Sequence, residues 1–232
     1  MKRFYKNVAA VQRDGGHQIE LDGKVVRTPL RKVLAVPSAA LGQAIADEWA
    51  SQEETIKPHS MPMMQLAATA LDRIAEERAS VASQIAAYAG SDLVCYRADQ
   101  PVDLTVRQNE TWQPLIDWAK SRYGTGLVVT TGITAVAQPD EALAAFADAV
   151  NAHDDFTMAA LSTVTALTGS LVISLALSEG HLNGEQAFEA AVLDETFQIE
   201  RWGLDYEAED RRISINAEIM AAERFLQLYR AD

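Results

Sequence analysis

The residue pattern of this 232-residue chain changes at Pro37, and that change limits the folds it can adopt. Before Pro37, two Asp-Gly steps, Asp14-Gly15 and Asp22-Gly23, separate short runs of β-forming residues. An Asp-Gly step between extended runs favours a tight hairpin turn, because such a turn needs positive φ. After Pro37, Ser38 can cap a helix, and apolar residues recur at helical spacing. The sequence therefore predicts a small antiparallel sheet over residues 4–36, followed by helices.

Helical patterns occupy most of the chain beyond this sheet. We predict an α+β fold, in which a small N-terminal antiparallel β domain precedes a larger, mainly α-helical domain. A β-rich domain with the first helix is expected at residues 1–60, and an α-helical domain at residues 61–232. The 155–178 helix is either continuous or broken near Gly169-Ser170. Helices are expected near residues 38–51, 66–88, 104–123, 143–150, 155–178, 184–202 and 214–229, with one isolated strand at 127–131.

Charge is distributed unevenly along the chain. The net charge is −13, but residues 1–36 carry a net charge of +5 and residues 37–232 a net charge of −18. Phosphate binding depends on Lys and Arg, so this balance disfavours nucleic acid and anionic membranes as partners. We expect a basic partner surface, no nucleic-acid partner, and a protein that is monomeric when free.

One uncharged stretch, Phe156 to Ser178, is long enough to cross a membrane. It is rich in Ser and Thr, and the acidic residues Asp155 and Glu179 flank it, so a buried helix is the better interpretation. The N-terminus has no apolar run of signal-peptide length, and the single cysteine, Cys95, precludes an internal disulfide. We expect no membrane insertion and a reducing compartment, with the cytosol as the default.

Motifs for catalysis and cofactor binding are missing from the sequence. The glycines at 15–16 and 124–126 do not open a helix after a strand, so they are interpreted as turns rather than phosphate loops. The four histidines are far apart and lack metal-ligand spacing, and no Gly-x-Ser-x-Gly occurs. Cys95 is interpreted as a small core residue. We expect no catalytic residue, no cofactor and no metal.

Carboxylates are densest near the C-terminus, where Asp194, Glu195, Asp205 and Glu207 lie close in sequence. Paired carboxylates can perform acid–base hydrolysis if burial separates their pKa values. A solvated helix end, with Arg211-Arg212 offsetting the acidic charge, explains the same residues more simply. A carboxylate-dependent hydrolase therefore remains an alternative function at this point.

The same region also suggests a surface for binding another protein. Glu195, Gln198 and Trp202 follow an i, i+3, i+7 pattern, so a helix would place an acid, an amide and an aromatic ring on one face. Burial of Trp202 would exclude this interpretation. Trp49, in contrast, continues the apolar stripe of the first predicted helix, so we expect a core role for it.

The order of motifs along the chain resembles that of the ATP synthase assembly chaperones that bind the free alpha subunit. The resemblance covers nearly the whole chain, and its strength lies in the order of many short segments. These segments are Arg3-Phe4-Tyr5-Lys6, Leu21-Asp22-Gly23-Lys24 leading to Arg27-Thr28-Pro29, Ile45-Ala46-Asp47-Glu48-Trp49 with Gln52, Ile56 and Pro58, Met61-Pro62, the segment from Leu66 to Asp72, the segment from Asp92 to Ala98, Trp112 through Trp118, Gly169-Ser170-Leu171, and Asp194-Glu195 through Trp202-Gly203.

This resemblance implies a chaperone that holds the alpha subunit until the beta subunit displaces it, without hydrolysing ATP. It also implies a small β domain followed by an α domain. Partner binding carries over to Glu195, Gln198 and Trp202, with Glu207 as a neighbour. Eukaryotic members of the family act in the mitochondrial matrix, whereas this chain lacks a long N-terminal extension, which implies a bacterial member in the cytoplasm.

Overall fold

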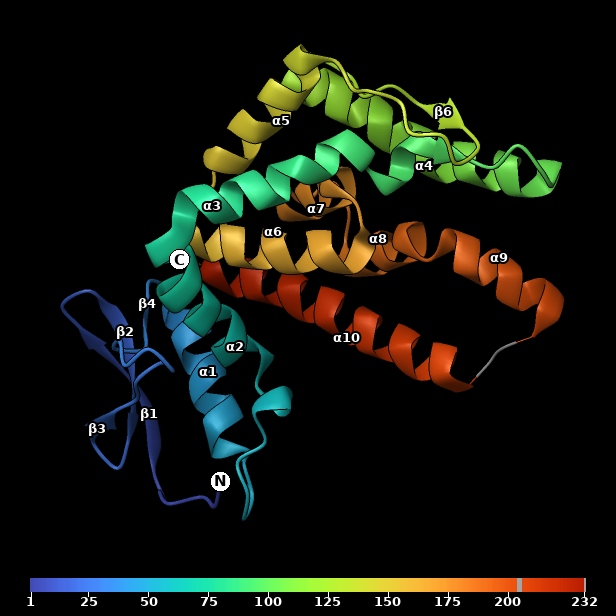
Figure 1. The fold of residues 1–232 in the computed structure, drawn as a ribbon. Coiled ribbons are helices and arrows are strands. Elements are labelled where there is room, and N and C mark those ends of the chain that lie inside the picture. Colours follow the sequence, from blue (N-terminus) through green and yellow to red (C-terminus); the bar gives the residue numbers. More distant parts are fainter. Residues whose placement is uncertain (204–205, 232) are drawn as a thin grey trace. The chain divides into compact units, whose positions relative to one another are not determined.

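The computed structural model describes residues 1–203 and 206–231 (Figure 1). The chain forms two compact units, each assembled from separate stretches of sequence. Unit 1 comprises Met1–Arg78, Asp155–Ala160 and Ala221–Asp232, and unit 2 comprises Ala79–Asp154 and Leu161–Met220. The predicted division at residue 60 follows chain order, whereas unit 1 also contains helical segments from the middle and the end of the chain.

The N-terminal part of unit 1 is a four-stranded antiparallel sheet. β2 (Gly16–Leu21) is central, with β1 (Val8–Arg13) on one edge and both β3 (Lys24–Val25) and β4 (Ala35–Val36) on the other. Asp22 and Gly23 connect β2 to β3 with φ angles of 49° and 77°. The left-handed conformation of both residues is what a tight Asp-Gly hairpin requires. The predicted antiparallel sheet is confirmed.

One helix, α1 (Ala39–Ala50), packs on β1 and β2 (Figure 1). The Ser38 hydroxyl accepts a hydrogen bond from the Leu41 amide at 3.0 Å, so the predicted N-cap is confirmed. A side chain at Gly42 would place its Cβ 2.8 Å from the Cβ of His17, so glycine allows the helix to approach the sheet closely. Leu41 and Ile45 are fully buried between these elements.

The C-terminal end of α1 supplies core and capping groups. Trp49 is 7% exposed, its backbone carbonyl accepts a hydrogen bond from the Tyr5 hydroxyl at 2.7 Å, and the two rings pack edge to face. The expected core role of Trp49 is confirmed. The Glu48 carboxylate accepts hydrogen bonds from the Met63 and Met64 amides at 2.7 and 2.9 Å, and so caps the next helix. Burial of this carboxyl raises its pKa to about 7.

Residues 62–91 form a run of helices with interruptions rather than one regular helix. α2 (Pro62–Thr69) continues into a π-helical segment, Ala70–Ile74, and then into α3 (Ala75–Ala86), which is kinked at Glu77. Helical periodicity in the sequence predicted this run but not its changes in helix type. Short 3-10 helices occur at Pro58–Ser60, Ala87–Ser91 and Leu93–Cys95.

The core of unit 2 is built around α7 (Leu171–Ser178), whose residues are all buried. Gly169, with φ of 68°, separates α7 from α6 (Asp155–Thr168), and Ser170 caps α7 through the Ile173 amide at 3.0 Å. Of the two alternatives left open for residues 155–178, the structure therefore has the pair broken at Gly169-Ser170. In the described part of the chain, no helix is long and apolar enough to cross a membrane.

The long helix α4 (Val102–Tyr123) contributes Trp112, a fully buried ring, to the core of unit 2. The Trp112 indole donates a hydrogen bond to the Ala190 carbonyl at 2.8 Å. Gly124 ends α4 with a left-handed φ of 77°, as the sequence predicted. The strand expected at 127–131 is wrong in extent and isolation, because β6 (Thr130–Thr131) pairs in parallel with β5 (Tyr96–Arg97).

The remaining helices lie in the second half of the chain. The predicted helix over 184–202 is two helices, because the chain breaks at Val192, where φ is −104° and ψ is 18°. Asn183 and Gln186 form a capping box at the start of the first of these two helices. The last helix begins eight residues before the predicted start at 214. The bounds are α5 (Asp140–Asn151), α8 (Gly184–Ala191), α9 (Leu193–Trp202) and α10 (Tyr206–Tyr229).

Candidate partner-binding site

Two ion pairs hold α9, the helix that carries the predicted binding face, against α4. Glu200 forms an ion pair with Arg107 at 2.7 Å, and Arg201 forms one with Asp103. Both guanidinium groups lie over the ring of buried Phe197, at 5.3 and 4.2 Å from its centroid. These contacts fix the rotation of α9 about its axis and leave Gln198 and Trp202 exposed.

The predicted site residues Glu195, Gln198 and Trp202 lie on α9, and Glu207 lies in the first turn of α10. Trp202 is 77% exposed, Gln198 and Glu207 are exposed, and Glu195 is half-buried. A partner-binding role requires an exposed Trp202, which is the arrangement found. The binding roles of the four residues stay a prediction.

Arg212 of α10 links three helices at this site. Its guanidinium donates hydrogen bonds to the Glu195 carboxylate at 3.4 Å and to the Thr196 hydroxyl at 3.0 Å. The same group lies 5.4 Å from the ring centroid of Phe188 on α8. The sequence indicated only that Arg212 offsets nearby acidic charge. In the structure it holds the Glu195 carboxylate in place, so it positions part of the predicted face.

The carboxylates considered for hydrolysis have other roles in the structure. Asp194 accepts a hydrogen bond from the Gln108 amide at 2.7 Å, and burial raises its pKa above the usual value. Glu195 is bound by Arg212, and Glu207 is exposed to solvent. Asp205, the fourth candidate, lies outside the described residues. Nothing in this arrangement supports the hydrolase alternative.

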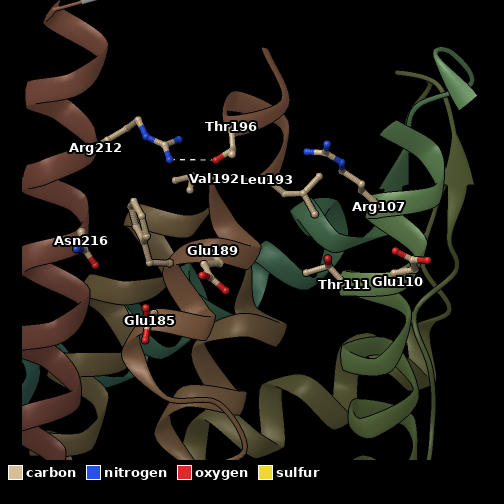
Figure 2. Close-up of a pocket in the computed structure, with 11 residues that line it drawn as sticks. Arg107, Glu110, Thr111, Glu185, Glu189, Val192, Leu193, Thr196, Arg212 and Asn216 are labelled. Atoms are coloured by element: carbon tan, nitrogen blue, oxygen red, sulfur yellow. Dashed lines mark hydrogen bonds between the residues drawn. The ribbon is translucent and has the colours of Figure 1, made fainter. Parts of the chain in front are cut away.

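A pocket of about 520 Å³ opens next to α9, between α4, α8 and α10 (Figure 2). Figure 2 shows Arg212 and Glu110 on opposite sides of the pocket, with Glu185 and Glu189 on α8. Glu110, Glu185 and Glu189 were not among the site residues predicted from the sequence, although the i, i+4 spacing of Glu185 and Glu189 indicates one helix face. The lining residues are Arg107, Glu110, Thr111, Glu185, Phe188, Glu189, Val192, Leu193, Thr196, Arg212 and Asn216.

The single thiol and the potential metal ligands offer no further site in the part of the chain that the structure describes. Cys95 is fully buried, and burial together with the nearby Asp92 carboxylate raises its pKa to about 12, so it stays protonated as a core residue. Within residues 1–203 and 206–231, no three His, Cys, Asp or Glu side chains are grouped to hold a metal ion.

Solved structures with the same fold define the class of this protein. The crystal structure of Atp12 from Paracoccus denitrificans matches with a TM-score of 0.93 and 37% identity, covering 99% of this chain and 98% of that chain. Atu1473, a putative chaperone from Agrobacterium tumefaciens, matches with a TM-score of 0.92 and 42% identity, covering 98% of this chain and 85% of that one. The fold is therefore that of a class of chaperones.

Sequence comparison narrows the class to one family. The family model described as ATP12 chaperone protein matches residues 2–120. Protein atp12, mitochondrial, from Schizosaccharomyces pombe is 27% identical over 214 residues, which cover 87% of this chain and 74% of the yeast protein. The chain belongs to the ATP12 chaperone family, and the resemblance drawn from its motifs is confirmed.

Proposed function

We propose that this protein binds the unassembled alpha subunit of ATP synthase and promotes assembly of the catalytic head, without hydrolysing ATP. Membership of a chaperone family supports a role in assembly. The observation that carries the proposal is the 77% exposure of Trp202 on a helix that is otherwise tightly fixed. An exposed tryptophan on a rigid element is a typical anchor for a protein partner.

The physical need for such a chaperone follows from the state of its client. A subunit without its partners exposes a large apolar interface, which promotes self-association. A protein that binds only this free form stabilises it by mass action and leaves when the beta subunit competes for the same surface. We place this activity in the bacterial cytoplasm and in a monomeric chaperone, whereas the fission yeast relative is named as mitochondrial.

The proposal is tested by mixing the purified protein with free alpha subunit and, separately, with the assembled catalytic head. Size-exclusion chromatography is expected to show a complex with the free subunit and none with the assembled head. ATP turnover by the chaperone alone is expected to be absent. Equal binding to both forms, or to neither, would refute the proposed function.

Variants on α9 test the binding face within the same assay. Trp202→Ala is expected to weaken alpha-subunit binding by at least about tenfold, because it removes an aromatic anchor. Ile133→Ala removes another exposed apolar side chain of unit 2 and serves as the control, with no change expected. Glu195→Lys is also expected to weaken binding of the alpha subunit, while its circular dichroism spectrum remains that of the folded protein. Full binding by both α9 variants would move the binding site elsewhere.

A further inference from the structure

The net negative charge of the protein belongs entirely to unit 2. Unit 2 contains seven Lys or Arg and twenty Asp or Glu residues, a net charge of −13, whereas unit 1 contains thirteen of each. The field around a surface of one sign attracts partners of the other sign and raises their rate of association. A partner segment that binds unit 2 is therefore expected to be basic.

The charged side chains that line the pocket of unit 2 are three carboxylates and two arginines. The two arginines are already engaged, Arg107 with Glu200 at 2.7 Å and Arg212 with Glu195 at 3.4 Å. In contrast, the pocket carboxylates of Glu110, Glu185 and Glu189 form no ion pair within the described part of the chain. The pocket therefore offers acceptors for a cation and no free cation of its own.

The apolar part of the pocket fits the stem of a long basic side chain. Phe188 is half-buried, and Val192 and Leu193 are buried in the pocket wall. The Arg212 guanidinium already lies over the Phe188 ring, 5.4 Å from its centroid, so the ring contributes apolar wall rather than a vacant cation site. Arginine can bury its methylene groups against such a wall while its five N–H groups reach carboxylates.

We propose that this pocket binds an arginine side chain of the alpha subunit, with the Glu185 and Glu189 carboxylates as the main acceptors and Glu110 as a third. The inference rests on the proposed function for the identity of the partner. The pocket adds a second contact to that of the α9 face, and an arginine is the side chain that the partner must present there. The same Arg212 side chain lines the pocket and holds Glu195, so the two contacts share a support.

A small probe tests the pocket without any partner protein. N-acetyl-arginine methylamide is titrated into the isotopically labelled protein, and the amide signals of Phe188 and Val192 are followed by NMR. Saturable shifts with a dissociation constant of about a few millimolar are expected, as for a single side chain. The uncharged N-acetyl-norleucine methylamide should cause shifts at least about fivefold smaller. Absence of saturable shifts with the arginine probe would overturn the proposal.

A matched pair of double variants gives the second arm. Glu185→Gln/Glu189→Gln is expected to abolish the arginine-induced shifts and to weaken alpha-subunit binding about tenfold. Asp99→Asn/Glu141→Gln removes the same charge from exposed sites of unit 2 outside the pocket, and should change neither. If the pocket variant binds the alpha subunit as tightly as the control, the pocket assignment is wrong while the proposed function stands. If the arginine shifts occur but no alpha subunit is captured, the proposed function is wrong instead.

Discussion

The two units of this protein differ in net charge and in the side chains that line their pockets. Unit 1 has no net charge, and its pocket of about 730 Å³ has an almost wholly apolar lining that includes Met61 and Met64. Unit 2 carries the full charge of −13 and has a smaller pocket lined by five charged side chains. Charges at a solvated surface cost little stability, so unit 2 can carry this excess of carboxylates while its core stays apolar.

Two tryptophans, one in each unit, differ in the same way in their exposure to solvent. Trp49 continues the buried stripe of α1 and is 7% exposed, whereas Trp202 at the end of α9 is 77% exposed. The backbone carbonyl of Trp49 accepts a hydrogen bond from Tyr5, and the Trp49 ring packs on the Tyr5 ring, so its removal leaves a cavity. Removal of Trp202 leaves no cavity.

The largest expected effect on stability follows from this pair. Trp49→Ala should lower the free energy of unfolding by about 3–5 kcal/mol, because it creates a cavity in the core. Trp202→Ala should change the same quantity by less than about 0.5 kcal/mol, as for an exposed site. Urea denaturation followed by circular dichroism measures both. Similar losses for the two variants would remove the distinction between a structural and an exposed tryptophan.

A smaller loss is expected at the contact that joins the helices around the pocket. Arg212→Met should lower the free energy of unfolding by about 1–3 kcal/mol, because the half-buried Glu195 loses its charged donor. Arg211→Met is the matched control, since the neighbouring Arg211 is exposed and should tolerate the change. Amide exchange in α9 should accelerate only in the Arg212 variant. Equal behaviour of the two variants would show that Arg212 does not position Glu195.

Local sequence patterns predict some elements of the fold and fail to predict others, because tertiary packing decides the latter. Asp22-Gly23, Ser38 and Gly124 each act within a few residues, so their turn, cap and helix end could be predicted. The break at Val192 could not, because apolar periodicity continues through it and tertiary packing decides the backbone there. The parallel pair of β5 and β6 is two residues long, too short for an alternating pattern.

Part of the candidate site could likewise be predicted from the sequence, and part could not. The face of Glu195, Gln198 and Trp202 follows from spacing on one helix, so the sequence could place these residues together. Glu110 and Glu189 line the same pocket although they are far apart along the chain. No local sequence pattern predicts that the two residues share a pocket. Arg212 belongs to the same group of long-range contacts. Carboxylate spacing also suggested hydrolysis, because spacing alone does not reveal that Asp194 is held by Gln108.

A pH effect on stability is expected from Glu48 of unit 1. Its folded pKa of about 7 exceeds the reference value of 4.5, so the folded state holds the proton more tightly. The resulting stabilisation is complete below about pH 4.5 and is lost as the pH rises through about 7, a change of about 1–2 kcal/mol after allowance for solvent screening. Glu48→Gln should remove the part of the pH dependence that Glu48 contributes, measured by urea denaturation across that range, whereas the part from buried Asp92, whose pKa is about 6, should remain. The exposed control Glu53→Gln should keep the Glu48 contribution, and equal slopes in both variants would contradict the assignment to Glu48.

The smallest expected effect is a response of unit 2 to salt. Raising the ionic strength from about 0.02 M to about 0.5 M screens repulsion among its excess carboxylates. The free energy of opening, from amide exchange, should therefore rise by less than about 1 kcal/mol in α4 and α8 and stay unchanged in α1. An equal rise in all three helices would indicate a general salt effect unrelated to the charge difference between the units.

We propose unit 2 as the surface that recognises a free ATP synthase subunit. Hydrogen–deuterium exchange of the protein with and without free alpha subunit tests it directly, because every helix is followed in one measurement. Protection of α8, α9 and the first turns of α10 is predicted, with the elements around the apolar pocket of unit 1 unchanged. Protection confined to α2 and the N-terminal segment of unit 1, with α8 and α9 unchanged, would contradict the claim.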